Sequence, residues 1–313
     1  MNIPRHLFTF FALVSLAVAA EPSAAPRPLQ QPARSAPPNV EFIHDVEIGT
    51  GGGRTLHAEI ARPKNPPATP MPAVLWVHGG GWSHGSQKGN GAVLLATKGY
   101  FTASIEYRLS DEAKWPAQIE DCKLGVRWLR ANAAKYNINP DRIGCWGSSA
   151  GGHLVACLGT MDDPKFEGAG GYPGVSSRVQ AVCDFYGPTD FSAGSAGIQS
   201  ATGEKDASAL LGLFGAPFKE KPELWKNGSP ILYVKPGNPP FLIAHGDKDI
   251  TVPIAQSENL MTALKKAGVP VELIVVKGGG HDFKAVRGEP PPEPDRKVIH
   301  DAVAAFFDKY LKQ

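Results

Sequence analysis

Short apolar runs alternate along this chain with longer segments of helical periodicity, and this alternation constrains the fold more than any other feature. Runs of this length with little polar alternation are typical of strands buried on both faces of a sheet. The runs are AVLWV from Ala73, FTASI from Phe101, RIGCW from Arg142, VQAVCDF from Val179, FLIA from Phe241 and VELIVV from Val271. We therefore expect a central sheet built largely from these segments.

Some of the segments around these runs carry apolar residues at helical spacing, which predicts helices packed on the sheet. The clearest stripe consists of Ile119, Cys122, Val126, Leu129 and Ala133. A second helix is expected to start at Pro253, because proline suits the first helical turn, and a third spans residues 299–310. Alternating strands and helices predict a mostly parallel sheet with helices on both faces, preceded by an antiparallel hairpin of residues 41–48 and 56–62.

The first 39 residues differ in composition from the rest. An apolar run over residues 7–20 follows Arg5 and ends in small residues, which predicts a cleaved signal peptide over residues 1–20 and a secreted or periplasmic protein. This run is short for a membrane span, which needs about 20 apolar residues. Residues 21–39 are rich in proline and predict an extended linker.

Residues 40–313 are then expected to form one α/β domain. Within it, residues 187–239 are rich in Gly, Pro, Ser and Asp and interrupt the alternation of strands and helices. A structureless loop of that length is uncommon in a compact domain. This region therefore predicts a cap-like insertion with small helices of its own.

The overall composition excludes several kinds of partner. The chain has 313 residues, 42% hydrophobic and 20% charged, with a formal net charge of +2. It has no dense Lys/Arg block, so we expect neither nucleic acid nor an anionic membrane surface as a partner. The four cysteines lie in apolar stretches with no zinc-motif spacing, which favours buried free thiols over disulfides and predicts no metal or cofactor.

The stretch RIGCWGSSAGGHL carries the strongest chemical signal. Gly147-Ser148-Ser149-Ala150-Gly151 fits G-x-S-x-G, centred on Ser149, between a predicted strand and a predicted helix. Small residues on both sides suit a strained turn in which neighbouring backbone comes close. Such pentapeptides also arise by chance, but the context predicts that Ser149 is presented as a nucleophile.

A second glycine-rich loop, HGGGW from His78 to Trp82, also follows a predicted strand. Bare backbone N–H groups can point at a substrate oxygen there, so we expect Gly80 and Gly81, together with Ala150, to form an oxyanion hole. The alternative of a phosphate-binding loop lacks the G-K-[ST] that would follow it.

A serine nucleophile needs a base and a group that orients the base. Asp249, in the segment after the FLIA run, is the expected acid, with Asp247 as a rival and Asp190 as a weaker one. A calcium loop starting at Asp247 is disfavoured, because the position that requires glycine holds Val252. His281, in a glycine-rich loop after the last apolar run, is the expected base.

The other histidines that the motifs leave unassigned are expected to have structural roles. His57, His84 and His300 are expected to be surface or core residues, and His153, one turn past Ser149, to pack or bond near the turn. The chain order of Ser149, Asp249 and His281 is that of the α/β-hydrolase arrangement.

From about Val40 onward the chain resembles secreted α/β-hydrolase esterases of the hormone-sensitive-lipase-like and feruloyl or acetyl-xylan-esterase-like groups. The matching motifs are HGGGW, EYRLS, NPDRIGCWGSSAGGHL, YGPTDF, HGDKDITVP and GGGHDF. The resemblance implies the α/β-hydrolase fold, the triad and oxyanion donors named above, and structural roles for Tyr107 and Arg108. The short segment before HGGGW departs from the family pattern, because it lacks the long N-terminal cap helices of many lipase-like relatives.

These motifs predict a serine esterase that works through an acyl-enzyme, and the predicted signal peptide indicates that it is exported. The resemblance adds short-acyl or feruloyl esters, free or on plant polysaccharide, as substrates. Trp82 and Trp225 are candidates for stacking on a sugar or phenolic ring, although tryptophan is more often buried in packing. A serine peptidase of the prolyl-oligopeptidase type and an inactive hydrolase-fold binding protein are the alternatives.

Overall fold

The computed structural model describes Met1, residues 36–194 and residues 208–312. The predicted signal peptide and most of the predicted linker lie outside these residues, as does the part of the insertion between 195 and 207. None of the helices in the described residues is long and apolar enough to cross a membrane.

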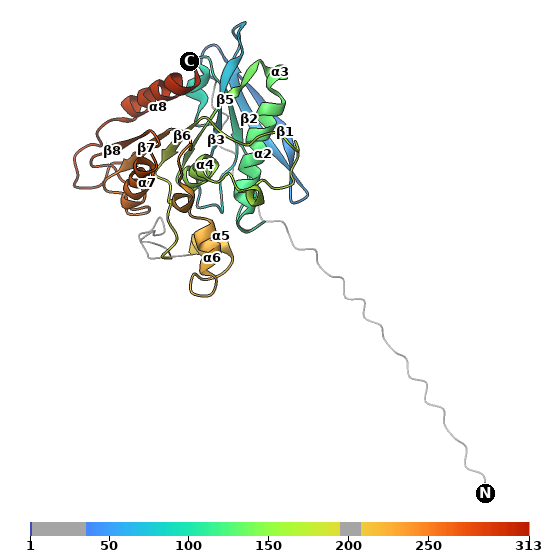
Figure 1. The fold of residues 1–313 in the computed structure, drawn as a ribbon, viewed down its shortest axis with the longest axis vertical. Coiled ribbons are helices and arrows are strands. Elements are labelled where there is room, and N and C mark those ends of the chain that lie inside the picture. The colour runs from blue at the N-terminus through green and yellow to red at the C-terminus, as the bar shows by residue number, and fades with distance from the viewer. Residues whose placement is uncertain (2–35, 195–207, 313) are drawn as a thin grey trace. The chain divides into compact units, whose positions relative to one another are not determined.

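An eight-stranded sheet organises the described part of the chain, with strand order β1-β2-β4-β3-β5-β6-β7-β8 (Figure 1). The strands are β1 (Val40–Gly51), β2 (Arg54–Pro63), β3 (Met71–Val77), β4 (Phe101–Ile105), β5 (Ile138–Ser148), β6 (Ala181–Phe185), β7 (Phe241–Gly246) and β8 (Val271–Val276). Strand β2 pairs antiparallel with β1 and β4, and all pairs from β4 to β8 are parallel. The predicted α/β-hydrolase fold, with a mostly parallel sheet and an N-terminal antiparallel hairpin, is confirmed.

Helices cover both faces of this sheet. They are α1 (Val93–Ala96), α2 (Ala117–Ala131), α3 (Ala133–Tyr136), α4 (Ala150–Thr160), α5 (Ser208–Phe214), α6 (Pro222–Asn227), α7 (Ala255–Lys266) and α8 (Arg296–Leu311), with 3₁₀ turns η1 (Pro164–Phe166), η2 (Pro230–Tyr233) and η3 (His281–Phe283). Apolar residues of α2, α4 and α7 share one core cluster, and those of α1 and α8 share another. The helix expected at Pro253 begins two residues later, at Ala255.

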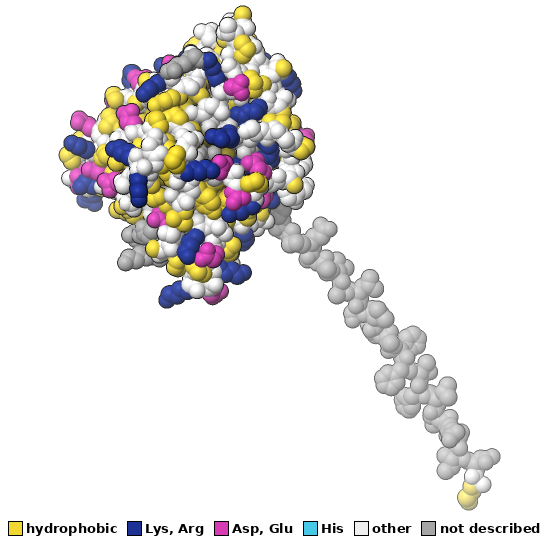
Figure 2. Space-filling model, in the orientation of Figure 1, with side chains coloured by type: hydrophobic (Ala, Val, Ile, Leu, Met, Phe, Trp, Pro, Cys, Tyr) yellow, Lys and Arg dark blue, Asp and Glu magenta, His cyan; other side chains and the backbone are white. Residues whose placement is uncertain are grey.

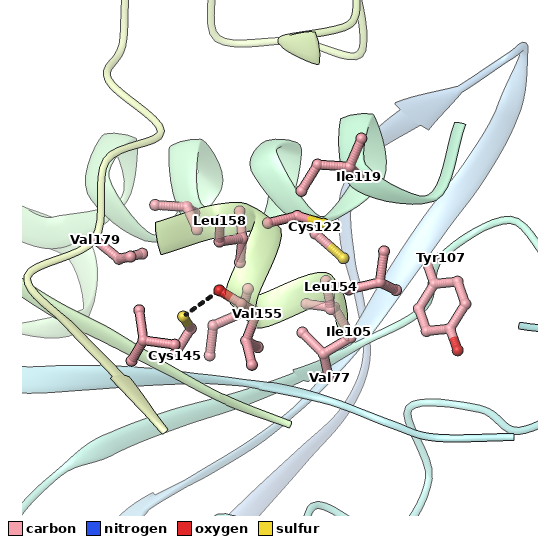
Figure 3. Packing of buried hydrophobic residues seen from close by; sticks show 14 of the residues in the cluster. Val77, Ile105, Tyr107, Ile119, Cys122, Cys145, Leu154, Val155, Leu158 and Val179 are labelled. Carbon is pink, nitrogen blue, oxygen red and sulfur yellow. Dashed lines mark hydrogen bonds between the residues drawn. The ribbon is translucent and has the colours of Figure 1, made fainter. Parts of the chain in front are cut away.

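The larger core lies between the sheet and the pair α2 and α4. Figure 3 shows Ile119 and Cys122 of α2 beside Leu154 and Leu158 of α4. All four cysteines are buried free thiols, as the sequence predicts. Burial of apolar surface contributes about 25 cal/mol per Å² to the free energy of folding. This packing therefore holds α4 firmly on the sheet.

The molecular surface agrees with the small net charge. Lys and Arg side chains are interspersed with Asp and Glu over the face drawn in Figure 2, and they form no continuous basic patch there. Within the described part of region 187–239, the helices α5, α6 and η2 are present.

Candidate active site

Ser149 lies in a strained turn between β5 and α4. Its φ of 56° and ψ of −121° are unusual for a residue with a side chain. A Cβ on Gly147 would lie 2.3 Å from the carbonyl oxygen of Gly151, and a Cβ on Gly151 would lie 2.1 Å from that of Val77. Both positions therefore require glycine, which is the physical reason for the G-x-S-x-G pattern.

Replacing Gly151 with alanine is expected to lower the free energy of unfolding by about 1–3 kcal/mol, because backbone of β3 and α4 must separate to admit the methyl group. Gly212→Ala on α5 is the matched control, since the nearest atom there is the Ser110 hydroxyl at 3.3 Å, on a side chain that can turn away. Urea unfolding of both variants measures the difference. Equal stability of the two would contradict this account of the turn.

The three predicted catalytic side chains meet at the carboxyl edge of the sheet. Each follows a parallel strand, namely β5, β7 and β8, and such strands end at one edge. His281 Nε2 lies 3.0 Å from Ser149 Oγ, and His281 Nδ1 lies 2.7 Å from Asp249 Oδ2. If Nδ1 carries the proton and donates a hydrogen bond to the carboxylate, Nε2 is unprotonated and can accept the serine proton.

Asp249 is held as an ionised acceptor. Its Oδ1 accepts the backbone N–H groups of Thr251 (2.8 Å) and Val252 (2.9 Å), and its Oδ2 also lies 3.3 Å from His245 Nε2. Burial raises the pKa of this carboxyl, but the hydrogen bonds from His245, His281 and Val252 outweigh burial and bring the pKa to about 2. The carboxylate is therefore charged at neutral pH.

The two rival carboxylates have other partners. Asp247 accepts the backbone N–H of Gly278 at 2.7 Å, and Asp190 accepts that of Ser192 at 2.8 Å. Neither forms a hydrogen bond with His281 in the part of the chain that the structure describes. The geometry favours Asp249 as the orienting acid.

His245 is a neighbour of the site to which the motifs assigned no role. It is fully buried at the end of β7, with Nδ1 2.6 Å from Ser257 Oγ and Nε2 2.8 Å from the carbonyl oxygen of Val252. Since that carbonyl only accepts, Nε2 carries the proton and can also reach Asp249. In the sequence, only the i, i+4 spacing of His245 and Asp249 could have indicated that the two side chains meet.

The loop carrying His281 is braced by an aromatic residue. The Tyr186 ring packs against the imidazole edge to face, with centroids 4.8 Å apart. Its hydroxyl donates to Asp282 Oδ1 at 3.0 Å, and the Arg296 guanidinium bonds the same residue. These contacts fix the imidazole orientation.

The HGGGW loop lies against the nucleophile. A Cβ on Gly79 would lie 3.3 Å from Ser149 Cβ, and the Gly80 carbonyl accepts the N–H groups of Ser83 and His84, both at 3.1 Å. Gly80 and Gly81 adopt positive φ values of 114° and 55°. Their amides and that of Ala150 have no hydrogen-bond acceptor among the described residues, so they are free to bind an oxygen.

Tyr107 supports the start of this loop, in agreement with the structural role that the resemblance implied. Its hydroxyl donates to the carbonyl oxygen of His78 at 3.1 Å, and the two rings stack with centroids 4.3 Å apart. Arg108 binds Asp121 of α2 through Nε at 2.8 Å. The segment after β4 is therefore anchored twice, to the HGGGW loop through Tyr107 and to α2 through Arg108.

The two tryptophans occupy packing positions. Trp82 is 3% exposed and Trp225 is 2% exposed. Trp82 donates its indole N–H to His153, and Trp225 donates to the carbonyl oxygen of Ala216 and stacks on Phe214. Neither ring offers a face on which a substrate could stack, so the substrate-binding role expected for them is replaced by a role in the core.

Asp184, on β6 below α4, is a buried carboxyl that the sequence did not single out. Its Oδ1 accepts the backbone N–H of Gly187 at 2.9 Å, whereas its Oδ2 has no partner among the described residues. Burial raises the pKa of this carboxyl to about 6, and the bond from Gly187 opposes the rise only in part.

The raised pKa of Asp184 should make the free energy of unfolding depend on pH. Its folded-state pKa of about 6 exceeds the unfolded value of about 3.9, so the folded chain binds a proton that the unfolded chain releases. Stability should therefore fall by up to about 3 kcal/mol as pH rises from about 4 to about 6. Asp184→Asn should remove this part of the pH dependence, as urea unfolding at pH 4.5 and 7.0 can measure. The exposed Asp141→Asn serves as control, and an unchanged slope in Asp184→Asn would refute the assignment.

Comparison with known proteins places these features in a family. Residues 59–264 match the BD-FAE family. Esterase LipC of Mycobacterium tuberculosis is 31% identical over 79% of this chain, and Esterase LipQ of the same organism is 32% identical over 72%. The chain spans only 62% and 53% of the length of these two relatives.

Solved structures show the same likeness. A truncated carbohydrate esterase from gut microbiota superposes with a TM-score of 0.74 and 32% identity, covering 87% of this chain and 97% of that one. Esterase Est2 of Thermogutta terrifontis has a TM-score of 0.67 and 25% identity, covering 87% of this chain and 92% of its own. With a family match over most of the folded region and this sheet topology, the chain belongs to the BD-FAE family, an esterase family of the α/β-hydrolase fold.

Proposed function

We propose that the protein is a serine esterase that hydrolyses carboxylic esters through an acyl-enzyme. The observation that carries the proposal is the unbroken chain of contacts from Ser149 Oγ to His281 and on to Asp249. Three residues distant in sequence converge with the distances that proton transfer requires.

In the first step, His281 Nε2 accepts the proton of Ser149 while Oγ bonds to the ester carbonyl carbon. The carbonyl oxygen becomes an oxyanion, and the N–H groups of Gly80, Gly81 and Ala150 stabilise it. Asp249 stabilises the imidazolium that forms. The protonated His281 then donates to the leaving alkoxy oxygen, which departs as the alcohol and leaves an acylated serine.

In the second step, a water molecule gives a proton to His281 Nε2 as its oxygen bonds to the acyl carbon. The Ser149 oxygen then leaves and takes the proton back from the imidazolium, which releases the carboxylic acid. The same oxyanion donors serve both steps, because each passes through a tetrahedral intermediate.

We propose esters of short acyl groups or ferulate, free or linked to plant polysaccharide, as the substrates. The similarity to a structure described as a carbohydrate esterase supports this class. The apolar run and small residues of residues 1–20 support export, so the ester would be met in the periplasm or outside the cell. N-terminal sequencing of the mature protein, expected to start after Ala19 or Ala20, tests the export.

A panel of substrates tests the activity. We expect turnover of 4-nitrophenyl acetate, 4-nitrophenyl butyrate or methyl ferulate, and none of a prolyl peptide 4-nitroanilide. A fluorophosphonate probe should label Ser149 in the same preparation. A folded protein that neither labels nor turns over any ester would be a binding protein, and preferential cleavage of the peptide would indicate a peptidase.

A further inference from the structure

His153 lies on α4, one turn past Ser149, and its backbone N–H donates to the Ser149 carbonyl oxygen at 3.0 Å. The side chain is fully buried, yet both ring nitrogens have polar partners. Trp82 Nε1 lies 3.2 Å from Nδ1, and the carbonyl oxygen of Gly228 lies 2.7 Å from Nε2. One imidazole therefore contacts the nucleophile helix, the HGGGW loop and the insertion.

These partners determine which nitrogen carries the proton. An indole N–H can only donate, so Nδ1 must accept, and a backbone carbonyl can only accept, so Nε2 must donate. Burial lowers the pKa of His153 to about 4, and the bond to Gly228 offsets this only in part, so the ring is neutral above that pH. Gly228 thus holds the tautomer in which Nδ1 is free to receive the bond from Trp82.

Aromatic neighbours fix the ring plane. Trp82, Phe191 and Trp115 surround the imidazole with centroid distances of 5.4, 5.3 and 5.5 Å. In such a site water cannot replace a lost hydrogen bond without displacing a ring, because interiors are close-packed. Loss of a hydrogen bond at either ring nitrogen should therefore shift the Trp82 side chain.

We propose that His153 is a positioning residue, which acts through Trp82 to fix the backbone of Gly80 and Gly81 relative to Ser149. This inference rests on the proposed esterase function. Trp82 directly follows Gly81, so its anchored indole limits where the two glycine N–H groups can point. Oxyanion donors act only within about 2.7–3.1 Å of the developing charge, and a misplacement of about 1 Å can cost up to about 100-fold in rate.

Two substitutions separate the roles of the ring nitrogens. In His153→Gln, the terminal amide nitrogen can replace Nε2 and donate to Gly228, but the acceptor for Trp82 is lost. In His153→Asn, a carbonyl oxygen lies near the place of Nδ1 and still accepts from Trp82. The proposal therefore expects His153→Gln to lower kcat for 4-nitrophenyl acetate by about 10- to 100-fold, with KM within about twofold, and His153→Asn to restore most of kcat.

A double-mutant cycle and a control complete the experiment. Trp82→Phe should lower kcat as much as His153→Gln, and the combined variant should be no slower than either. Tyr100→Phe removes a partly buried hydrogen bond to Asp308 at the distant α8, so it should lower the melting temperature without changing kcat. Normal kcat in His153→Gln, or equal loss of kcat in Tyr100→Phe, would overturn the proposal.

Hydrogen exchange of the peptide covering residues 79–84 gives a readout that needs no turnover. His153→Gln should exchange faster there than wild type, whereas His153→Asn should not. If the wild-type protein hydrolyses no ester, the proposed function fails, and the exchange data still decide whether His153 orders this loop. Unchanged exchange in His153→Gln would reject the positioning role by itself.

Discussion

Replacing Ser149 with alanine is expected to lower kcat for 4-nitrophenyl acetate by about 10⁵- to 10⁶-fold, to the level of the remaining oxyanion donors and binding contacts. Without Oγ no acyl-enzyme can form, and His281 has no proton to accept. The Ser149 hydroxyl bonds only His281 among the described residues, so the melting temperature should change little. Steady-state kinetics with the folded variant, checked by circular dichroism, measure the effect.

Ser148→Ala is the matched control, because the two serines are adjacent and only Ser149 contacts His281. This control should keep activity within about tenfold of wild type, since a side chain outside the reacting atoms contributes little to the barrier. Fluorophosphonate should label wild type and Ser148→Ala but not Ser149→Ala. The assignment is wrong if Ser149→Ala keeps more than a tenth of the wild-type rate.

The strands could be predicted because parallel strands buried on both faces leave uninterrupted apolar runs in the sequence. Each of the six runs from Ala73 onward corresponds to a strand of the sheet. The last of them, β8, lies at the sheet edge, and only its Val276 is buried. The apolar runs do not mark where the strands end, as β5 shows. It begins at Ile138, before the apolar run, because pairing with Met71 of β3 recruits polar residues of the loop. Pairing across a sheet is a tertiary effect that local composition does not record.

The candidate site could be predicted in part, because residues that follow parallel strands lie at the same edge of the sheet. Ser149, Asp249 and His281 each follow a strand whose carboxyl end reaches the same edge, so topology brings them together. Gly147 and Gly151 were predictable for a related reason, since a strained turn leaves no room for Cβ. The distances between the three side chains follow from the packing of three separate loops.

The remaining contacts depend on packing between segments distant in the sequence. His153 meets Gly228 of the insertion, 75 residues further along the chain, through folding that no local pattern encodes. Trp82 and Trp225 had suggested substrate contact because each stands in a loop or insertion near the site. A tryptophan's exposure is set by its neighbours, and here those neighbours cover both rings.

Replacing Asp249 with asparagine is expected to lower kcat by about 10⁴-fold. The amide keeps the shape of the carboxylate but has no charge to stabilise the imidazolium. Its N–H₂ group, if turned toward His281, favours the tautomer that cannot accept the serine proton.

The ionised Asp249 also contributes to stability. Its pKa of about 2 lies below the unfolded value of about 3.9, so the carboxylate contributes about 2.6 kcal/mol to the free energy of unfolding above about pH 4. This contribution is lost as pH falls from about 4 to about 2.

Two further carboxylates make this experiment decisive. Asp190→Asn keeps its oxygen for the backbone N–H of Ser192, so it should retain activity within about threefold, because it removes no contact to the reacting groups. Asp247→Asn can still accept from Gly278 and should be far less damaging than Asp249→Asn. If Asp247→Asn abolished turnover while Asp249→Asn kept it, the orienting acid would be Asp247. The loop between β7 and α7 would then have to rearrange to bring that side chain to His281.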